Sequence, residues 1–581
     1  MSRPPLGAAR PHDTEHAIQF VGPGQLVHNR AKPVPQPGPT QLLVQVEAVG
    51  ICFSDTKLLH AFSGHPRKNV VLGGIDPGVL AEIPSYVPGE APTVPGHEVA
   101  CRIVAVGTDV RRHRVGERCL VQTDYRHLPT VQANAAFGYN FEGGLQEYVL
   151  LDERMILEPG TGERFLIPVA EGPGSSAVAL LEPWACVESS YAYRERRELR
   201  SDGRLLVVAD GGHEIDGLAG LVSRSRPAAL TGVAATGGQR SALAALDIPD
   251  LSTASIDGLP RESFDDVVYF GADPATIERL QEALAPRGML NVVTGGRRIG
   301  RPVAVDVGRV HYDLVRWVGT TATDAADAYR SVPDSGELLP GDRVLVVGAA
   351  GPMGLMHVVR AASGGVAGVT IVGADIDDAR LAHLAHTVEP IAAAHGVPLQ
   401  LVNSRETPLE PGFTYAAVLV PAPFLVTQAV DLAGERCRIN LFAGFAVHTR
   451  SDIDLDRYID TRCYLLGTSG SVIDDMRAVL AKLERGDLDT NISVDAVCGM
   501  EGVADALDAV EARTSGGKIV VYPSLHDMGL VRLSELPERF PAAAALLADG
   551  TWTKAAEDAL LRDAASEATG AATGGGATAQ P

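Results

Sequence analysis

The chain has 581 residues, which is enough for three or four domains of ordinary size and for an ample core. Its net charge of −22 argues against binding to nucleic-acid phosphates and against docking on an anionic membrane. No apolar run approaches the roughly 20 residues needed to span a bilayer, and the N-terminus lacks the apolar core of a signal peptide. We therefore expect a cytoplasmic protein without nucleic-acid or membrane partners.

The chain contains seven cysteines, an odd and sparse set that does not form a disulfide framework. No CxxC pair occurs among them, which excludes a four-thiolate structural zinc site. We expect most of these thiols to be small buried hydrophobic groups.

The first third of the chain predicts a short polar leader followed by a β-barrel. Residues 1–20 are polar and rich in proline, which favours disorder. From residue 41 onward, alternating runs such as QLLVQVEAVG, EVACRIVAVG and GLQEYVLL are separated by Gly and Pro at close spacing. This pattern is typical of a small all-β barrel, which we place at 21–199, rather than of βαβ units.

After residue 200, predicted strands and helices alternate, and the pattern occurs twice. GRLLVVADGG, from Gly203, matches DRVLVVGAAG, from Asp342, and Gly319 and Gly467 fall at the same place in each copy, 148 residues apart. We therefore predict an α/β protein with two tandem doubly wound, Rossmann-like domains. We place the first copy at 200–333, the second copy at 334–523, a helical C-terminal extension at 524–567 and a disordered tail at 568–581.

Only the second copy keeps a phosphate-binding turn. VLVVGAAGPMG places Gly351 and Gly354 between a buried strand and a helix, whose N-terminal N–H groups can hold a pyrophosphate. Asp375 ends the next predicted strand, where a carboxylate accepts from both ribose hydroxyls and repels a 2′-phosphate, which favours NAD over NADP. The candidate cofactor contacts are Gly348, Gly351, Pro352, Met353, Gly354, Asp375 and Arg380.

The corresponding turn of the first copy is degenerate. Gly212 is kept there, but Ile215 replaces the last glycine and Glu214 stands at the entrance of the helix, where an acidic side chain opposes phosphate. We expect residues 200–333 to bind no nucleotide and to act in subunit contact or in covering the active site.

A second group of residues suggests a metal centre. His97 and Glu98 follow a Pro-Gly turn at the start of a predicted strand, and an imidazole beside a carboxylate can form half of a zinc site. Cys52 offers a thiolate, and Glu182 offers a carboxylate at the start of a helix. Each residue alone is more often structural, but the set together favours zinc.

The order of these motifs resembles that of the medium-chain, zinc-dependent alcohol and polyol dehydrogenases. Cys52 comes first, then Gly96-His97-Glu98, then Glu182-Pro183, and finally the glycine-rich turn. The Glu-Pro pair is similar to that of the sorbitol and threonine dehydrogenase branch. The segment VCGMEGVADALDAVEARTSGGKIVVYP also resembles the closing helix and strand of that superfamily. The matches span about 27–523.

This resemblance implies a GroES-like catalytic domain with one catalytic zinc and no structural zinc. The zinc would be held by Cys52, His97 and either Glu98 or Glu182, and Ser54 would relay the proton of the alcohol. Asp55 would support the ligands. The chain departs from the family in its tandem Rossmann copy, in its C-terminal extension and in the absence of a lobe with four cysteines.

We expect a zinc- and NAD-dependent dehydrogenase acting on the secondary alcohol or ketone of a polyol, sugar or sugar phosphate, assembled as a homodimer or homotetramer. A basic group just after the Cys52 loop could attract a phosphorylated or carboxylated sugar; it consists of Lys57, His65, Arg67 and Lys68. A solvated loop is the simpler interpretation of this group. Two alternative functions remain: an epimerase or lyase that uses tightly bound NAD transiently, and a non-catalytic binding protein.

Overall fold

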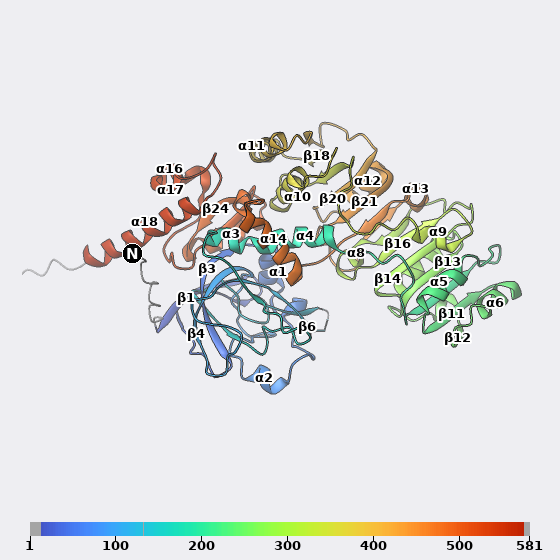
Figure 1. Ribbon diagram of the computed structural model, residues 1–581, viewed down its shortest axis with the longest axis horizontal. Coiled ribbons are helices and arrows are strands. Elements are labelled where there is room, and N and C mark those ends of the chain that lie inside the picture. Colours follow the sequence, from blue (N-terminus) through green and yellow to red (C-terminus); the bar gives the residue numbers. More distant parts are fainter. Residues whose placement is uncertain (1–12, 132, 575–581) are drawn as a thin grey trace, which may run out of the picture. The chain divides into compact units, whose positions relative to one another are not determined.

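The computed structural model describes residues 13–131 and 133–574 and divides into two compact units (Figure 1). Unit 1 combines the chain up to Glu188 with the chain from Gly470 onward, and unit 2 is the segment Ser189–Ser469. The described residues include no helix long and apolar enough to cross a membrane.

Unit 1 is built on an eight-stranded sheet with the order β26-β24-β25-β3-β4-β5-β9, in which β8 also pairs with β3. Its strands are β3 (Gln41–Gly50), β4 (Glu98–Val106), β5 (Arg118–Val121), β8 (Tyr148–Asp152), β9 (Leu166–Pro168), β24 (Val494–Cys498), β25 (Lys518–Val521) and β26 (Val531–Arg532). Strands β3 and β8 are almost wholly buried, as their runs of Leu and Val require. Smaller strand pairs and several short helices complete this unit. Those used below are α1 (Phe53–Ala61) and α3 (Ser175–Ala179), and α4 (Leu181–Ala192) begins in this unit with Glu182 in its first turn.

The C-terminal part of the chain completes this N-terminal sheet. Strand β25 pairs antiparallel with β3, with Val520 opposite Gly50 and Val521 opposite Val49. Residues 470–523, predicted as the end of the second nucleotide domain, therefore lie in unit 1. The pairing joins strands more than 400 residues apart, which a local sequence pattern does not indicate.

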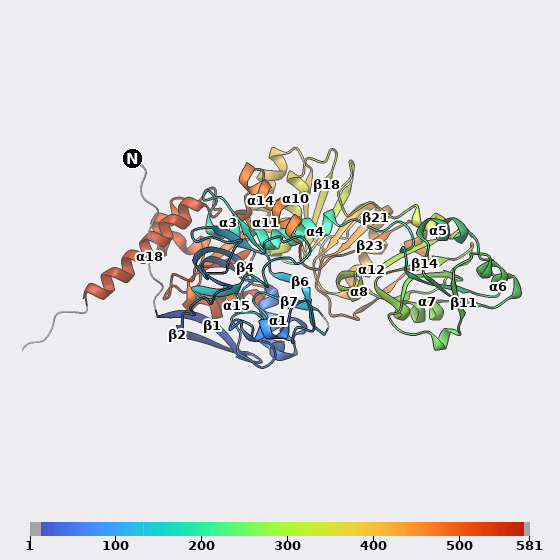
Figure 2. The same cartoon turned by 60° about the horizontal axis from the view of Figure 1, so that its bottom comes forward.

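Parts of both chain ends that the sequence predicts to be disordered form regular structure. Strand β1 (Thr14–Gly22) pairs with β2 (Gln25–Pro33), so the predicted leader 1–20 already contains most of a strand. Helix α18 (Lys554–Gly574), labelled in Figure 2, extends into the predicted tail 568–581. Residues 1–12 and 575–581 lie outside the described residues.

The C-terminal extension is attached to unit 1 by a buried carboxylate. Glu557 of α18 accepts hydrogen bonds from the backbone N–H groups of Ser175 and Ser176, at 2.6 and 2.8 Å, and from the Tyr522 hydroxyl at 3.0 Å. Trp552 donates its indole N–H to the same hydroxyl at 3.0 Å. The two serines begin helix α3, so this acid from the extension satisfies free N–H groups at that helix start.

Unit 2 contains two six-stranded parallel sheets of the same topology. Their strand orders are β12-β11-β10-β13-β14-β16 and β19-β18-β17-β20-β21-β23. The first sheet comprises β10 (Arg204–Ala209), β11 (Ala229–Ala234), β12 (Asp250–Thr253), β13 (Phe264–Phe270), β14 (Leu284–Val293) and β16 (Arg316–Thr320). The second comprises β17 (Arg343–Val347), β18 (Thr370–Asp375), β19 (Leu399–Asn403), β20 (Phe413–Val418), β21 (Ala433–Leu441) and β23 (Tyr464–Leu466). This doubly wound order is that of the Rossmann fold.

Helices cross over between these parallel strands. Those used below are α5 (Leu218–Ser225), α8 (Val307–Tyr312), α10 (Pro352–Ser363), α11 (Asp378–Ala394) and α13 (Leu455–Asp460). One continuous hydrophobic cluster contains residues from both sheets of unit 2. The two sheets therefore share a core.

Candidate zinc and nucleotide sites

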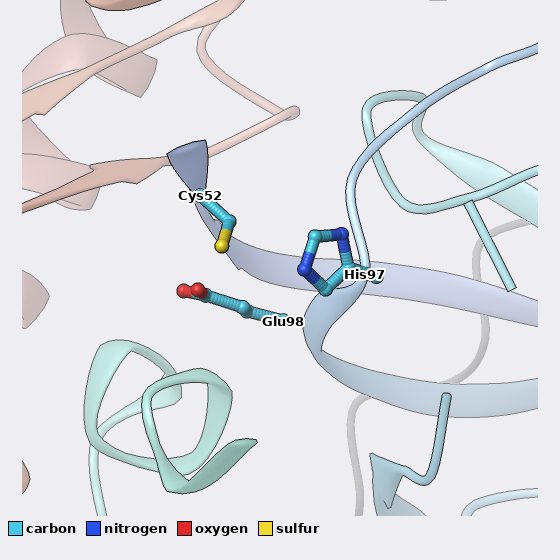
Figure 3. Close-up of side chains that lie close together, drawn as sticks. All are labelled: Cys52, His97 and Glu98. Carbon is cyan, nitrogen blue, oxygen red and sulfur yellow. The ribbon is translucent and has the colours of Figure 1, made fainter. Parts of the chain in front are cut away.

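Three of the predicted zinc ligands converge in unit 1. One ligand atom each of Cys52, His97 and Glu98 lies within 4.8 Å of the others, and Figure 3 shows the thiol, the imidazole and the carboxylate directed toward one space. Cys52 precedes helix α1, and His97 and Glu98 stand at the start of β4. Gly96 before them has a φ of +90°, which favours glycine, and this turn delivers the two side chains.

The surroundings of these residues fit a cation. Glu98 is fully buried, and its Oε2 atom has no hydrogen-bond partner within the described protein. A buried carboxylate oxygen without a partner is costly unless a cation or donor meets it. Thiolate, imidazole and carboxylate together form a donor set that suits zinc.

Asp55 holds this group in place, as expected for a supporting residue. It is fully buried, and it accepts hydrogen bonds from the backbone N–H of Cys52 at 2.9 Å and of Gly96 at 3.3 Å. Its Oδ1 lies 3.2 Å from His97 Nδ1. Burial alone would lower the pKa of His97, but Tyr139 and Asp55 outweigh it and raise that pKa. The bond to Nδ1 leaves Nε2 as the ring nitrogen available to a metal.

Ser54, the predicted proton relay, lies beside His97. Its hydroxyl oxygen is 3.2 Å from His97 Nε2, at the edge of the Cys52–His97–Glu98 group. The hydroxyl can both accept and donate a proton.

Glu182, the second candidate carboxylate, is buried in the same region but outside the 4.8 Å group. Burial raises its pKa to about 7; the neighbouring His97 lowers it and Glu98 raises it further. Its Oε1 accepts a weak hydrogen bond from the Cys186 thiol at 3.5 Å. The geometry therefore favours Glu98 over Glu182 as the partner of Cys52 and His97.

Two residues that the sequence did not single out belong to this site. Lys518 of β25 donates to Glu98 Oε1 at 2.5 Å and to the carbonyl of Ile51 at 2.7 Å. The Tyr139 ring lies 5.6 Å from that of His97. Neither has a motif signal: Lys518 is 420 positions from Glu98, and Tyr139 lies in an irregular loop.

The four basic residues proposed to bind substrate have different environments. The His65 ring lies 5.1 Å from the Tyr139 ring, and burial together with the Arg67 charge lowers the pKa of His65 to about 4. Arg67 forms a 2.5 Å ion pair with Asp124. Lys57 lies on α1; partial desolvation of its ammonium lowers its pKa, and the nearby Cys52 thiol raises that pKa by less.

Lys68 differs from these residues because its side chain is fully buried. Its ammonium donates to the carbonyls of Val87 and Ala91, the latter at 2.8 Å. These two bonds stabilise the loop from within. His65, Arg67 and Lys57 are therefore the members of the predicted basic group that remain candidates for substrate binding.

The glycine-rich turn of unit 2 has the form that phosphate binding needs. Gly348 has a φ of +83°, and a Cβ on Gly354 would lie 2.3 Å from the Gly348 carbonyl oxygen, so neither position accepts a larger residue without strain. Helix α10 starts at Pro352 directly after Gly351, with free N–H groups beyond the turn. Met353 follows in the first turn of the helix.

Asp375 lies beside this turn at the end of β18. Its Oδ2 accepts from the backbone N–H of Ala350 at 3.0 Å, and its Oδ1 accepts from that of Ile376 at 2.8 Å. Arg380 reaches back from α11 and donates to the Ala350 carbonyl at 3.3 Å. Each Asp375 oxygen keeps a lone pair for a ligand hydroxyl.

The equivalent turn of the first copy has a different form. Helix α5 begins only at Leu218, and the loop before it is filled by the chain's own groups. The Tyr269 hydroxyl donates to Asp210 Oδ2 at 2.7 Å, and the Gln239 amide donates to the carbonyls of Asp210 and His213, both at 2.7 Å.

Comparison with known proteins agrees with this fold. Residues 38–160 match the model of the alcohol dehydrogenase GroES-like domain. The L-sorbose 1-phosphate reductase of Klebsiella pneumoniae is 29% identical over 239 residues, which are 39% of this chain and 56% of that protein. The D-altritol 5-dehydrogenase of Agrobacterium fabrum is 28% identical over 185 residues, which are 30% of this chain and 44% of that protein.

A solved structure also has this fold. The 2R,3R-butanediol dehydrogenase of Bacillus subtilis aligns with a TM-score of 0.50 and 14% identity, covering 88% of this chain and 100% of that one. By these sequence matches, the chain is similar to the medium-chain dehydrogenases. It spans about half the length of the two curated relatives named above.

Proposed function

We propose that the protein is a zinc- and NAD-dependent oxidoreductase that transfers a hydride between NAD and a secondary alcohol or ketone of a polyol, sugar or sugar phosphate. The convergence of Cys52, His97 and Glu98 around one space, with Ser54 at its edge, carries the proposal. The two curated relatives, a sugar-phosphate reductase and a polyol dehydrogenase by name, support this substrate class.

The residues of unit 1 divide the work as follows. Cys52, His97 and Glu98 would hold the zinc, which when bound supplies a Lewis acid that lowers the pKa of a substrate hydroxyl. Lys518 offsets part of the negative charge by holding one oxygen of Glu98. Ser54 would take the alcohol proton and pass it outward.

In unit 2, the turn from Gly348 to Gly354 would bind the pyrophosphate of the cofactor, which supplies the hydride acceptor. Asp375 would accept from the ribose hydroxyls and disfavour a 2′-phosphate, so NAD is the proposed cofactor. The first copy, with its filled loop and late helix start, is proposed to bind no nucleotide.

The substrate would contact the side of the metal group formed by His65, Arg67 and Tyr139. Arg67 can offer donors to a phosphate or carboxylate, but Asp124 already neutralises part of its charge. A phosphorylated substrate would therefore gain most where Lys57 adds a second positive charge.

The deciding experiment combines metal analysis with a substrate screen on the purified chain. We expect one zinc per chain, and NADH formation with one or more polyols or sugar phosphates. Cys52→Ala should remove both the zinc and the activity. Cys498→Ala, which changes a buried thiol of β24 in the same unit, should keep both. Full zinc content in Cys52→Ala would contradict the proposed site.

The same preparation separates the alternatives. NAD that stays bound through purification without net NADH release would indicate an internal redox cycle, as in an epimerase or lyase. Absence of both zinc and nucleotide would favour a binding protein.

A further inference from the structure

The two copies in unit 2 contact each other through equivalent surfaces. Residues 302–320 and 450–468 align without a gap at an offset of 148, and four positions are identical: Asp306 and Asp454, Arg309 and Arg457, Gly319 and Gly467, and Thr320 and Thr468. In each copy the aspartate caps the helix that follows: Asp306 accepts from the N–H of Arg309, and Asp454 from that of Arg457. Residues 148 positions apart therefore have the same local structure in the two copies.

One strand from each copy forms the pair that joins them. At the centre of this pair, a residue of the first copy stands opposite the residue at the corresponding position of the second copy. Strand β15 (Val303–Asp306) runs antiparallel to β22 (Arg450–Ile453), and Ala304 stands opposite Asp452, which is the same position in the other copy. On either side, Val303 faces Ile453 and Val305 faces Ser451. In a contact with two-fold symmetry, a residue that contacts a second position in the partner is matched by the second residue contacting the first position. The pairs on either side of Ala304 and Asp452 follow this rule.

A second contact, away from these strands, follows the same rule. A Cβ on Gly319 would lie 2.7 Å from the Ile459 side chain, and a Cβ on Gly467 would lie 3.3 Å from the Cα of His311. Positions 311 and 459 are again 148 apart. Each of these two equivalent glycines thus makes room for a helix of the opposite copy, α13 in one case and α8 in the other.

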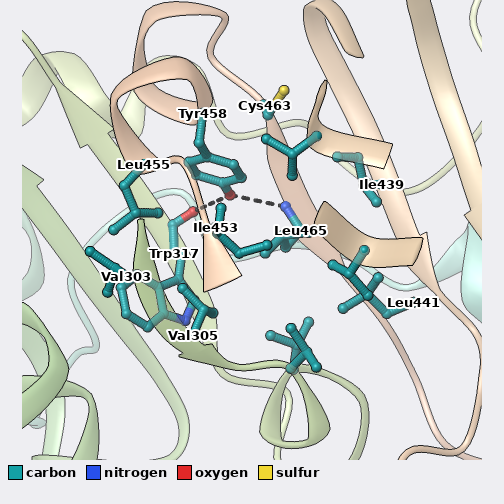
Figure 4. Packing of buried hydrophobic residues seen from close by; sticks show 14 of the residues in the cluster. Val303, Val305, Trp317, Ile439, Leu441, Ile453, Leu455, Tyr458, Cys463 and Leu465 are labelled. Carbon is teal, nitrogen blue, oxygen red and sulfur yellow. Dashed lines mark hydrogen bonds between the residues drawn. The ribbon is translucent and has the colours of Figure 1, made fainter. Parts of the chain in front are cut away.

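The sheet edges β16 and β23 meet close to this pseudo-two-fold axis. Figure 4 shows the Tyr458 hydroxyl donating to the carbonyl of Trp317 at 2.9 Å and accepting from the N–H of Leu465 at 3.0 Å. Trp317 and Leu465 are equivalent positions, so one hydroxyl bridges the two edges. Arg316 of β16 adds a hydrogen bond to the carbonyl of Gly467 at 3.0 Å.

We propose that the first copy is a built-in partner subunit of the second, so that unit 2 is an internal dimer whose sheet edge β23 is closed to another chain. An uncovered edge would present unpaired N–H and C=O groups to any second sheet. In unit 2 the first copy of the same chain covers the β23 edge of the second copy, and the contact has the symmetry that a homodimer contact would have. Any oligomer of this protein must then form through a different surface.

Engineered disulfides in the full-length protein test whether the contact forms within one chain. Ala304 and Asp452 are directly opposed and reach the surface, and opposed strand residues have Cα separations that a disulfide accepts. We expect the double variant Ala304→Cys with Asp452→Cys to lose two titratable thiols on mild oxidation and to remain at the single-chain mass of 61.0 kDa on a denaturing, non-reducing gel. The two single variants are the controls and should form no cross-link.

A covalent species of twice that mass would overturn the proposal, because it would show that the edges of two different chains pair. The second opposed pair, Val305→Cys with Ser451→Cys, guards against poor disulfide geometry at the first. If neither pair loses its thiols, the two copies do not meet in solution as described, and the proposal is wrong.

Discussion

Asp55 illustrates how one residue without a catalytic role of its own can hold a site together. Its carboxylate accepts from the backbone of Cys52 and Gly96 and from the ring of His97. Replacing it by Asn removes the charge and puts a donor where His97 and two N–H groups need an acceptor. Partners of this kind commonly contribute about 10–100-fold to metal affinity.

We predict that Asp55→Asn weakens zinc binding by about 10–100-fold, as measured by competition with a chromophoric chelator. Thr56→Val is the matched control, because Thr56 is a buried neighbour on the same helix whose hydroxyl donates to the carbonyl of Phe53 and not to a predicted zinc ligand. Equal zinc affinity in the two variants would show that Asp55 does not orient the ligands.

Glu15, which is not a member of either candidate site, gives a pH prediction. Its side chain is fully buried with Oε1 3.5 Å from Lys32 Nζ, and burial raises its pKa from 4.5 to about 7 despite that lysine. The Glu15 carboxylate therefore binds a proton more tightly in the folded protein than in the unfolded chain. The resulting stabilisation is complete below about pH 4.5 and is lost as the pH rises through about 7, a change of about 3 kcal/mol.

Glu15→Gln keeps an acceptor for the N–H of Tyr148 but cannot titrate. The free energy of unfolding of the wild type, relative to this variant, should fall by up to about 3 kcal/mol between about pH 4.5 and 8. Denaturant unfolding of both proteins at several pH values measures it. A constant difference across that range would contradict the raised pKa.

Single residues also show how far sequence reasoning reaches. Cys52, Ser54, His97 and Glu98 lie in short motifs with a chemical meaning, and the structure brings them together. The sequence prediction groups Lys68 with the other basic residues of its loop because of its charge. In the structure its ammonium donates hydrogen bonds to two carbonyls inside that loop. Burial of a lysine depends on the fold around it, and a local sequence does not reveal it.

At the scale of elements, the two glycine turns allow a matched comparison. In the second copy a Cβ on Gly351 would lie 3.3 Å from a guanidinium nitrogen of Arg380, and in the first copy a Cβ on Gly212 would lie 2.4 Å from one of Arg297. Each turn thus has an arginine beside its glycine. An added carboxylate would meet similar surroundings in both turns.

We predict that Gly351→Asp reduces NAD affinity at least about 10-fold, because a carboxylate at the start of α10 repels the pyrophosphate. Gly212→Asp should leave NAD affinity and stoichiometry unchanged. Titration calorimetry with NAD measures both. Reduced stoichiometry in Gly212→Asp would show that the first copy binds nucleotide after all.

Elements close in sequence are easier to predict than those that pair over long distances. The alternation of strands and helices, and the internal repeat, follow from hydrophobic period and self-similarity. The pairing of β25 with β3, and of β15 with β22, depends on where distant segments meet. For this reason the sequence pattern assigns residues 470–523 to the nucleotide domain, whereas they complete the sheet of unit 1.

At the scale of the whole molecule, the shared core of unit 2 makes the stability of one copy depend on the other. Trp317, from the first copy, is buried in the same cluster as Tyr458 and Leu465 of the second. Two sheets with separate cores would unfold independently, but a common core couples them. A substitution that disrupts the shared core should therefore destabilise both sheets, even when the substituted residue belongs to one copy.

Trp317→Ala tests this coupling. Removing a buried Trp side chain costs about 3–5 kcal/mol, and its cavity would open onto residues of both sheets. We expect backbone amides of β13 and β20, central strands of the two sheets, to exchange with deuterium faster by similar factors. Val222→Ala is the control: this residue lies in a cluster dominated by the first copy, so its loss should affect β13 far more than β20. If Trp317→Ala also leaves the exchange rates of the β20 amides unchanged, the second copy folds without support from the first. The proposal that the first copy is its partner would then rest on the contact between the sheet edges alone.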